Sequence, residues 1–370
     1  MRIEMKFPLL CGVAALAGLP LVAQSTLLGV TFDGNVFEID EATAVGTFVG
    51  RAGVDELNAL ELDDQERYLS AADQQVYTVD PATGDATFIA GFDLEGSIRS
   101  LAVAQDGTVL AFTGGLRFDA ARNAYALDLV TGVATPVALD VPYSVQAATF
   151  DPQGTLYAWT TDVSSGAEGG LITIDPATGE FTDVNPQVGD QGLNLQSLAF
   201  DPLGGLYGVT TEGTLWLIRP QTGVLITLVG VGPYSDIRGL SWLLPDGVFA
   251  TFQSIDVRAG VCRNLTVAQT VSLTAPEFDR GVIVDCADLG LVANGGDIVS
   301  VWGRGTARTA SFRGTVERLV DGANLVCDNL TQGLTVGPVA LAGTDWDCAE
   351  AGLSIAPGDA VSARITGVAQ

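Results

Sequence analysis

A repeat of about 45 residues is the feature of this sequence that most limits the folds open to it. The string DPATG occurs at 80–84 and 175–179, and its relatives DLVTG and RPQTG occur at 128–132 and 219–223. The glycines that end these strings are 48, 47 and 44 residues apart. Self-similarity at a nearly fixed period of this length is typical of arrays of one supersecondary unit, so we expect a repeat architecture.

A second marker runs in phase with the first and consists of an apolar run followed by a turn. It occurs at 60–66, 101–107, 148–154, 198–204 and 240–247. In the fourth copy, turns with Gly or Pro separate four short apolar runs. These runs cover 196–201, 206–210, 214–219 and 224–229. Short β-branched and aromatic runs with such turns predict hairpins, and four strands in 40–50 residues predict a propeller blade.

The two ends of the repeat region complement each other. Residues 26–40 match 205–219 position by position, so the region begins at the second strand of a blade. The missing first strand is present at the other end, at 238–243. We therefore predict an all-β chain whose residues 24–249 form a five-bladed β-propeller closed by both its ends, which leaves no exposed sheet edge in the ring.

The C-terminal part carries a duplication of another kind. VCRNLT at 261–266 matches VCDNLT at 326–331, and DCADLGL at 285–291 matches DCAEAGL at 347–353. Glycine positions after each second cysteine also correspond. We expect two small disulfide-bonded β-sandwich-like repeats. Their predicted bounds are 250–312 and 313–370.

The cysteines of this part read as structural. Cys262, Cys286, Cys327 and Cys348 allow three pairings. The duplication favours one bridge in each copy, Cys262–Cys286 and Cys327–Cys348. A unit of about 60 residues has a thin core, which a disulfide stabilises. The sequence has no C-x-x-C motif and no lone activated thiol, so nothing in it indicates redox chemistry.

The first 23 residues resemble an export signal. Arg2 and Lys6 precede an apolar run at 7–17, and Ala23 offers a small residue at the cleavage point. We expect a signal peptide over 1–23 and a secreted or extracellular protein, with the periplasm or cell surface as alternatives. Cys11 leaves a lipoprotein open, although leucines precede it. No other segment approaches 18 apolar residues, so we expect no transmembrane segment in the mature chain.

Composition excludes several classes of chemistry. The chain has 17 basic and 44 acidic residues, a net charge of −27 and no histidine. Nucleophile systems that need histidine and zinc sites with histidine ligands cannot be built. The negative charge argues against nucleic acid as a partner. No calcium-loop motif occurs, so we predict no metal and no cofactor.

The starts of the five predicted innermost strands share one register, in which a long polar residue precedes a small one. The polar residues are Asn58, Arg99, Gln146, Gln196 and Arg238. One such side chain per blade would ring the channel mouth, and two arginines favour carboxylate, phosphate or sugar oxygens.

A structural alternative for this ring stays open. The same side chains could satisfy buried backbone groups or pair with Glu56, Glu95 and Asp236. Tyr143 and Tyr234 lie in the sequences VPYS and GPYS just before two of the strands. There their aromatic faces could meet a sugar, so both are further candidate ligand-binding residues.

The LYxxDPxTG pattern of the repeats resembles secreted bacterial propellers of the YVTN, NHL and quinoprotein-like kind. The resemblance covers about 60% of the chain and implies a propeller fold. Quinoprotein repeats place a tryptophan a few residues after the turn. Phe88, Phe181 and Leu225 stand there in this sequence, so we expect no quinone cofactor.

These features favour a secreted, non-catalytic binding or adhesion protein that uses the propeller face. Its partner would be a polysaccharide, an anionic small molecule or a surface protein. A carboxylate-based glycoside hydrolase of the five-bladed type is one alternative, with Glu56, Glu95 and Asp236 as candidates. No pair among them is singled out, so no catalytic residue is assigned. A structural envelope protein is the other alternative.

Overall fold

The computed structural model describes residues 26–370 with short gaps. The gaps are residues 42, 115–122, 142–143, 162–168, 185, 188, 190, 192, 202–203, 232–234, 245–248, 274–281, 288–290 and 320–322. The predicted signal peptide over 1–23 lies outside the described residues. The described chain is all-β, and within it no helix is long and apolar enough to cross a membrane.

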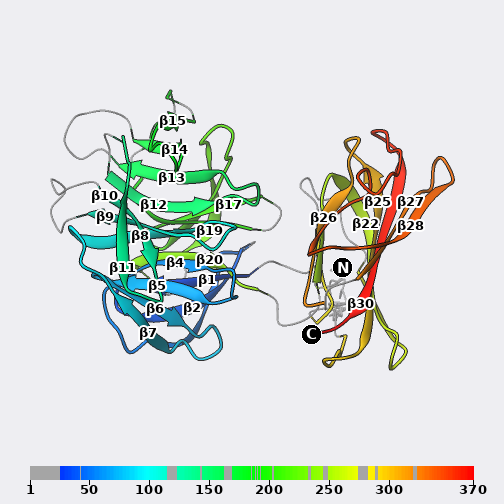
Figure 1. The fold of residues 1–370 in the computed structure, drawn as a ribbon, viewed down its shortest axis with the longest axis horizontal. Helices are drawn as coiled ribbons and strands as arrows, with labels where there is room; N and C mark the ends of the chain where they lie inside the picture. Colours follow the sequence, from blue (N-terminus) through cyan, green and yellow to red (C-terminus); the bar gives the residue numbers. More distant parts are fainter. Residues whose placement is uncertain are drawn as a thin grey trace, which may run out of the picture.

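In the described chain up to residue 244, the N-terminal part, the strands form five antiparallel sheets of four strands each (Figure 1). The first sheet has β20 (Ile237–Trp242), β1 (Thr26–Thr31), β2 (Asn35–Asp40) and β3 (Gly46–Arg51). The second has β4 (Leu57–Leu62), β5 (Tyr68–Ala72), β6 (Gln75–Val79) and β7 (Ala86–Gly91). The third has β8 (Ser97–Val103), β9 (Val109–Gly114), β10 (Asn123–Asp128) and β11 (Val133–Val137).

The remaining two sheets follow the same meander. One has β12 (Ser144–Phe150), β13 (Leu156–Thr161), β14 (Gly170–Ile174) and β15 (Phe181–Asp183). The other has β16 (Leu195–Phe200), β17 (Leu206–Thr210), β18 (Thr214–Ile218) and β19 (Leu225–Val231). The four strands predicted in the fourth repeat agree with β16 to β19 within two residues. The arrangement is propeller-like.

The first sheet joins strands from opposite ends of the N-terminal part. β1 pairs with β20, with Leu27 opposite Trp242 and Gly29 opposite Leu240. This is the pairing that the match between 26–40 and 205–219 predicts.

The first strands of the five sheets lie against one another in a continuous series. β4 contacts β8, β8 contacts β12, β12 contacts β16, β16 contacts β20, and β20 contacts β4. Small residues allow this approach: a Cβ on Gly239 would lie 2.3 Å from the Ala59 carbonyl oxygen. Between two other sheets, the Ser100 hydroxyl accepts a hydrogen bond from the Ala148 amide at 2.7 Å. Only small side chains fit where backbones come this close.

The C-terminal part, residues 249–370, folds into two further sheets. A four-stranded sheet has the order β24 (Val282–Asp285), β21 (Phe249–Phe252), β26 (Arg313–Glu317) and β29 (Asp345–Asp347). A six-stranded sheet has the order β23 (Gln269–Leu273), β22 (Ile255–Asn264), β25 (Ile298–Ala307), β30 (Ala360–Val368), β27 (Asn324–Asn329) and β28 (Leu334–Ala340).

The two cysteine repeats share these sheets, which differs from the expectation of two separate small sandwich-like repeats. β21 of the first copy pairs with β26 of the second, and β25 pairs with β30. One hydrophobic core holds buried residues of both copies, including all four cysteines. A unit of about 60 residues has only a marginal core on its own. Pairing the two copies gives both of them one larger, shared core.

The disulfides have the predicted pairing. Cys262 bonds Cys286 and Cys327 bonds Cys348. In each copy, one cysteine lies in the six-stranded sheet and the other directly follows a strand of the four-stranded sheet. Each disulfide therefore links the two sheets across the shared core.

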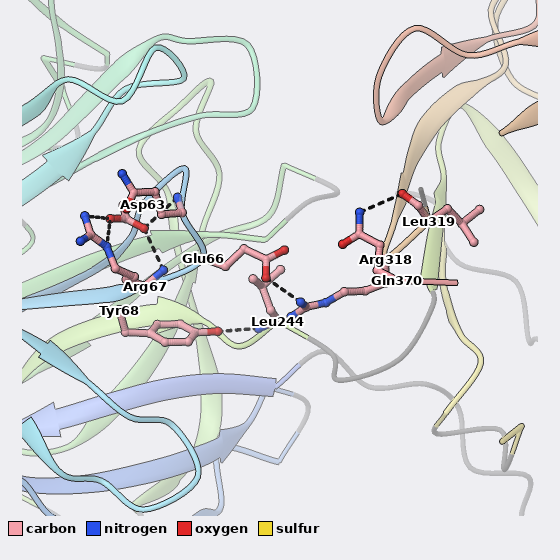
Figure 2. Close-up of polar contacts among 9 residues, drawn as sticks. Asp63, Glu66, Arg67, Tyr68, Leu244, Arg318, Leu319 and Gln370 are labelled. Carbon is pink, nitrogen blue, oxygen red and sulfur yellow. Dashed lines mark hydrogen bonds and ion pairs between the residues drawn. The ribbon is translucent and has the colours of Figure 1, made fainter. Parts of the chain in front are cut away.

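The two parts of the chain touch through apolar and polar contacts. The Trp242 and Phe249 rings lie 5.5 Å apart, so β20 and β21 share a cluster across the connection. Figure 2 shows a polar contact between the parts, in which the Arg318 guanidinium pairs with Glu66 at 2.5 Å. In the same view the Leu244 amide, at the end of the N-terminal part, donates to the Tyr68 hydroxyl of that same part at 2.7 Å. The C-terminal part is thus fastened to the turn between β4 and β5.

Candidate functional site

The polar residues predicted to ring the channel mouth lie near the starts of the first strands of the five sheets, and four of them occupy β-bulges. In β8 the pairing with β9 steps from Ile98 to Ser100, leaving Arg99 without an opposite residue. The same step omits Gln146 in β12, Gln196 in β16 and Arg238 in β20. A bulge adds one residue to one strand and redirects its side chain, and bulges are frequent beside functional sites.

In the second sheet, the strand pairing is irregular in a different way at the corresponding position. Asn58 pairs with Ala71, and the register shifts between Asn58 and Glu61. Ala59 takes a φ of 61°, in the left-handed region that non-glycine residues rarely adopt. All five strands therefore break their regular pairing near the polar residue. The sequence register identified these positions, but nothing in it indicated the bulges.

Several polar ring side chains are held by neighbours. Asn58, Gln146 and Gln196 are buried, with exposed fractions of 5%, 8% and 7%. The Gln146 amide donates to the Ser144 hydroxyl at 3.0 Å, and the Asn58 amide donates to the Glu56 carbonyl at 3.0 Å. These hydrogen bonds fix the orientation of the Gln146 and Asn58 side chains.

Arg238 connects β20 with β16. Its Nε donates to the Asp236 carboxylate at 2.6 Å and its Nη1 donates to Gln196 Oε1 at 2.8 Å. Its guanidinium carbon also lies 5.2 Å from the centre of the Phe32 ring. The Gln196 amide nitrogen in turn donates to Asn194 at 2.6 Å.

The charge of Arg238 acts on Arg99. Burial lowers the pKa of the Arg99 guanidinium, and the positive charge of Arg238 lowers it further. Arg99 on β8 and Arg238 on β20 therefore lie within electrostatic reach of each other, although their strands belong to different sheets. An anion placed between two partly desolvated guanidinium groups would relieve their repulsion.

The carboxylates considered as partners have separate roles. Asp236 pairs with Arg238, whereas the Glu95 carboxylate accepts a hydrogen bond from the Asn123 amide at 3.3 Å. Glu56 and Asp236 both take positive φ values, 63° and 58°, just before β4 and β20. Tyr143 and Tyr234 lie outside the described residues.

One further titratable residue, Glu61, escaped the sequence analysis. Burial raises the pKa of the Glu61 carboxyl well above its usual range, and a hydrogen bond with Thr149 offsets part of this effect. Glu61 lies on β4 and Thr149 on β12. The contact therefore joins two sheets whose first strands are separated by β8 in the series. The aligned residues of the other four strands are small. They are Ala102, Thr149, Ala199 and Ser241.

The aligned strands could have indicated Glu61, because a glutamate is unusual at a position where the other four strands carry small residues. Within the described residues, no group of three or more histidine, cysteine or acidic side chains could hold a metal ion. The site as described consists of amides, guanidinium groups, the Asp236 carboxylate that pairs with Arg238, and the Glu61 carboxyl. Such a set can bind oxygen-rich groups by hydrogen bonds and charge.

Comparison with known sequences gives no relative. No protein family model matches the chain, and no curated protein matches its sequence.

Comparison with solved structures gives distant matches. One is a protein of unknown function from Bacteroides caccae, with 10% identity and a TM-score of 0.34 over 55% of this chain and 72% of that chain. Another is described as a gluconolactonase from Xanthomonas campestris, with 17% identity and a TM-score of 0.38 over 57% and 78%.

A third match is the extracellular domain of a putative hybrid two-component system from B. thetaiotaomicron. It has 13% identity and a TM-score of 0.33, over 79% of this chain and 44% of that chain. All three TM-scores lie below 0.5, so the propeller-like architecture is assigned from the strand pairing of this chain itself.

Proposed function

We propose that the five sheets of the N-terminal part are the blades of a closed five-bladed propeller. The series of contacts from β4 through β8, β12 and β16 to β20 and back to β4 supports closure. The sheet that combines β20 with β1 to β3 supports a ring locked by both ends of the region. The pairing of β1 with β20 means that β1 is not left as a sheet edge, and a ring locked in this way gives a rigid frame for a site at the axis.

We also propose that the protein is exported. The signal-like pattern over 1–23 and the two disulfides support this, since disulfides persist in oxidising compartments. The strongly acidic composition is compatible with a soluble protein outside the cell.

Within this frame, we infer a non-catalytic binding or adhesion protein whose ligand occupies the channel mouth. The single observation that carries this inference is the bulge at Arg99, Gln146, Gln196 and Arg238, which recurs in four separate sheets. A packing requirement alone would be met by small residues at these positions, and the neighbouring small residues already meet it. Four redirected long polar side chains suit a common ligand.

The proposed ligand carries anionic or polar oxygen atoms. Arg99 and Arg238 lie within electrostatic reach of each other, and the surrounding amides can both donate and accept hydrogen bonds. An anionic small molecule, a polysaccharide or an acidic surface group of another protein fits this chemistry. The carboxylate-based glycoside hydrolase remains the alternative, and the test below separates the two.

The test is binding of the mature protein to a glycan array and to soluble polysaccharides, with product analysis for hydrolysis. Arg99→Gln is the informative variant, because the chain itself places glutamine at this bulge in β12 and β16. Removing one charge-assisted contact is expected to weaken binding about tenfold or more.

Arg51→Gln serves as the matched control. Arg51 is an exposed arginine of the outer strand β3, where it lies 3.8 Å from Asp55. The same charge is removed there without touching the ring, so binding should stay within about twofold. Equal loss in both variants, or binding with cleavage of the glycan, would contradict a non-catalytic site at the channel mouth.

A further inference from the structure

The six-stranded sheet has one face in the core of the C-terminal part and one face turned away from the N-terminal part (Figure 1). Cys262, Val301 and Ala363 are fully buried, whereas their neighbours Trp302 and Arg364 are half-exposed and exposed. Because successive residues of a strand point to opposite faces, Trp302 and Arg364 lie on the outer face.

Three arginines gather on this outer face, although the whole chain has a net charge of −27. They are Arg263 on β22, Arg304 on β25 and Arg364 on β30. In the part of the chain that the structure describes, no ion pair or side-chain hydrogen bond engages their guanidinium groups. The face therefore offers unneutralised positive charge to an anion.

Two of these arginines border a hollow that also contains the aromatic residue. The hollow has a volume of about 150 Å³ and is lined by Val261, Arg263, Ser300, Trp302 and Arg364. Trp302 lies directly opposite Val261 on one side and Arg364 on the other. Arg263 lies opposite Ser300, one same-face step along the sheet.

Ser300 forms the buried floor of the hollow. Its side chain is 4% exposed, and its hydroxyl accepts a hydrogen bond from the Thr366 hydroxyl at 3.1 Å. The Ser300 hydroxyl is thus fixed, and its own proton is available to an acceptor.

The second cysteine copy shows that the hollow is not required by the fold. There Asp328 takes the place of Arg263, and its carboxylate accepts hydrogen bonds from Thr335 at 2.7 Å and Ser362 at 3.0 Å. Ser362 matches Ser300, so the same framework is satisfied internally in one copy. In the first copy the arginine leaves it open.

We propose that Arg263, Trp302 and Arg364 form a binding site for a carboxylated sugar unit of an acidic polysaccharide, separate from the channel mouth. The guanidinium groups match a carboxylate in charge and geometry. The ring of Trp302 provides an apolar surface for the C–H face of a sugar, and the Ser300 hydroxyl adds a hydrogen bond.

The size of the hollow fits one sugar unit rather than a whole oligosaccharide. Pockets for drug-sized ligands usually measure about 300–1,000 Å³, well above the 150 Å³ here. One unit would enter while the rest of the polymer lies along the outer face of the sheet. Arg304 on this face lines no part of the hollow.

Hexagalacturonate is a suitable probe, measured by titration calorimetry with the mature protein. The wild type is expected to bind it, and Arg263→Asp should weaken binding at least about tenfold, since it replaces an attractive contact by a repulsive one. Aspartate already occupies the matching position, Asp328, so the fold accepts it. Trp302→Ala should show a loss of similar size.

The matched control is Arg304→Thr. It removes one charge from the same face, and threonine stands at the corresponding position, Thr366. Its effect should stay within about twofold at physiological salt, because exposed charges are screened. Arg51→Gln, which removes an exposed charge from β3 of the N-terminal part, should also leave hexagalacturonate affinity unchanged. Melting temperature and intact disulfides verify folding of each variant.

Several outcomes would overturn the proposal. These are no binding at millimolar hexagalacturonate, equal binding of neutral maltohexaose, or equal losses in Arg263→Asp and Arg304→Thr. Dextran sulfate that binds as tightly as hexagalacturonate, with no effect of Trp302→Ala, would indicate simple charge attraction and would overturn it as well.

Discussion

The two cysteine copies have the same interior and different surfaces. In the first, the buried Asn264 amide donates to the Val292 carbonyl at 2.9 Å and to Asp297 at 2.8 Å. In the second, Asn329 donates to Ser354 at 2.9 Å and to Asp359 at 2.7 Å. The matching network holds the matching loop in both copies.

On the outer face the copies have diverged. Asp328 completes a hydrogen-bonded triad with Thr335 and Ser362, whereas Arg263 stands over an open hollow beside Trp302. The comparison teaches that the duplicated interior carries stability, which both copies must supply because they share one core. The surface of one copy is then free to acquire a binding site.

The largest expected effect is loss of a disulfide, and it should be equal in the two copies. The bridged cysteines are separated by 24 and 21 residues. Loops of this size predict about 3 kcal/mol of stabilisation each. Urea denaturation of C262A/C286A and C327A/C348A should show the same destabilisation within about 1 kcal/mol. A large loss for one pair and none for the other would break the equivalence of the interiors.

The next effect is loss of the buried asparagines. Asn264 and Asn329 are 1% and 0% exposed. Replacing either by alanine leaves its hydrogen-bond partners without this donor. We expect either substitution to lower the free energy of unfolding by about 2 kcal/mol, measured by denaturant unfolding of the protein.

Gln332→Ala is the control. It removes a single contact, from Gln332 Nε2 to Asp359 at 2.8 Å, and should cost clearly less.

A third test uses a position where the copies differ in charge at the contact with the N-terminal part. Burial raises the pKa of Glu317 to about 7, and the negative charges of Glu66 and Asp345 add to this effect. The Thr251 and Thr315 hydroxyls contact each other. Glu317 lies two residues after Thr315 and Gln253 lies two residues after Thr251, so Gln253 is the matching residue of the first copy. Glu317→Gln therefore copies one repeat into the other.

The sign of the pH effect follows from the raised pKa. The folded protein keeps a proton that the unfolded chain releases above its ordinary pKa of 4.5, so stability falls as pH rises from about 4.5 to 7. Glu317→Gln should remove this decline and stabilise the protein at pH 8 by on the order of 1 kcal/mol, because Glu317 is only partly buried. Melting temperatures from pH 4 to 8 test this. A variant that is less stable at pH 8 would contradict it.

The smallest stability effect should come from the outer face. Arg263→Asp removes no hydrogen bond among the described residues and should change stability by less than about 0.5 kcal/mol. The reciprocal change Asp328→Arg breaks the triad and should cost about 1 kcal/mol. Thermal unfolding compares them. A larger cost for Arg263→Asp would mean that this arginine is structural rather than a free ligand-binding group.

Much of the fold was legible in the sequence because its signals are local. Turn glycines and alternating apolar runs place strands such as β16 to β19, and the duplication favours the observed disulfides. The sharing of both sheets by the cysteine copies was not predictable in this way. Pairing of β25 with β30 depends on contacts distant in the chain, and a repeated motif does not reveal whether its copies pair.

The candidate site was predictable only in part, for a related reason. The register identified Arg99 and Arg238, but a bulge depends on the partner strand and leaves no mark in a single strand's sequence. Glu61 was not predicted because it lies within a strand, whereas the candidate carboxylates were those of the loops before the strands. The outer-face hollow joins Arg263, Trp302 and Arg364 from three strands, which only the pairing of the copies brings together.

The proposed function is tested most directly by titrating the glycan that binds best on the array into wild-type protein, Arg99→Gln and Arg51→Gln. The chain length of the recovered glycan is measured in the same samples. We expect the wild type and Arg51→Gln to bind alike, Arg99→Gln to bind at least about tenfold more weakly, and the glycan to be recovered intact. Unchanged affinity in Arg99→Gln, or a shortened glycan, would contradict a non-catalytic binding site at the channel mouth.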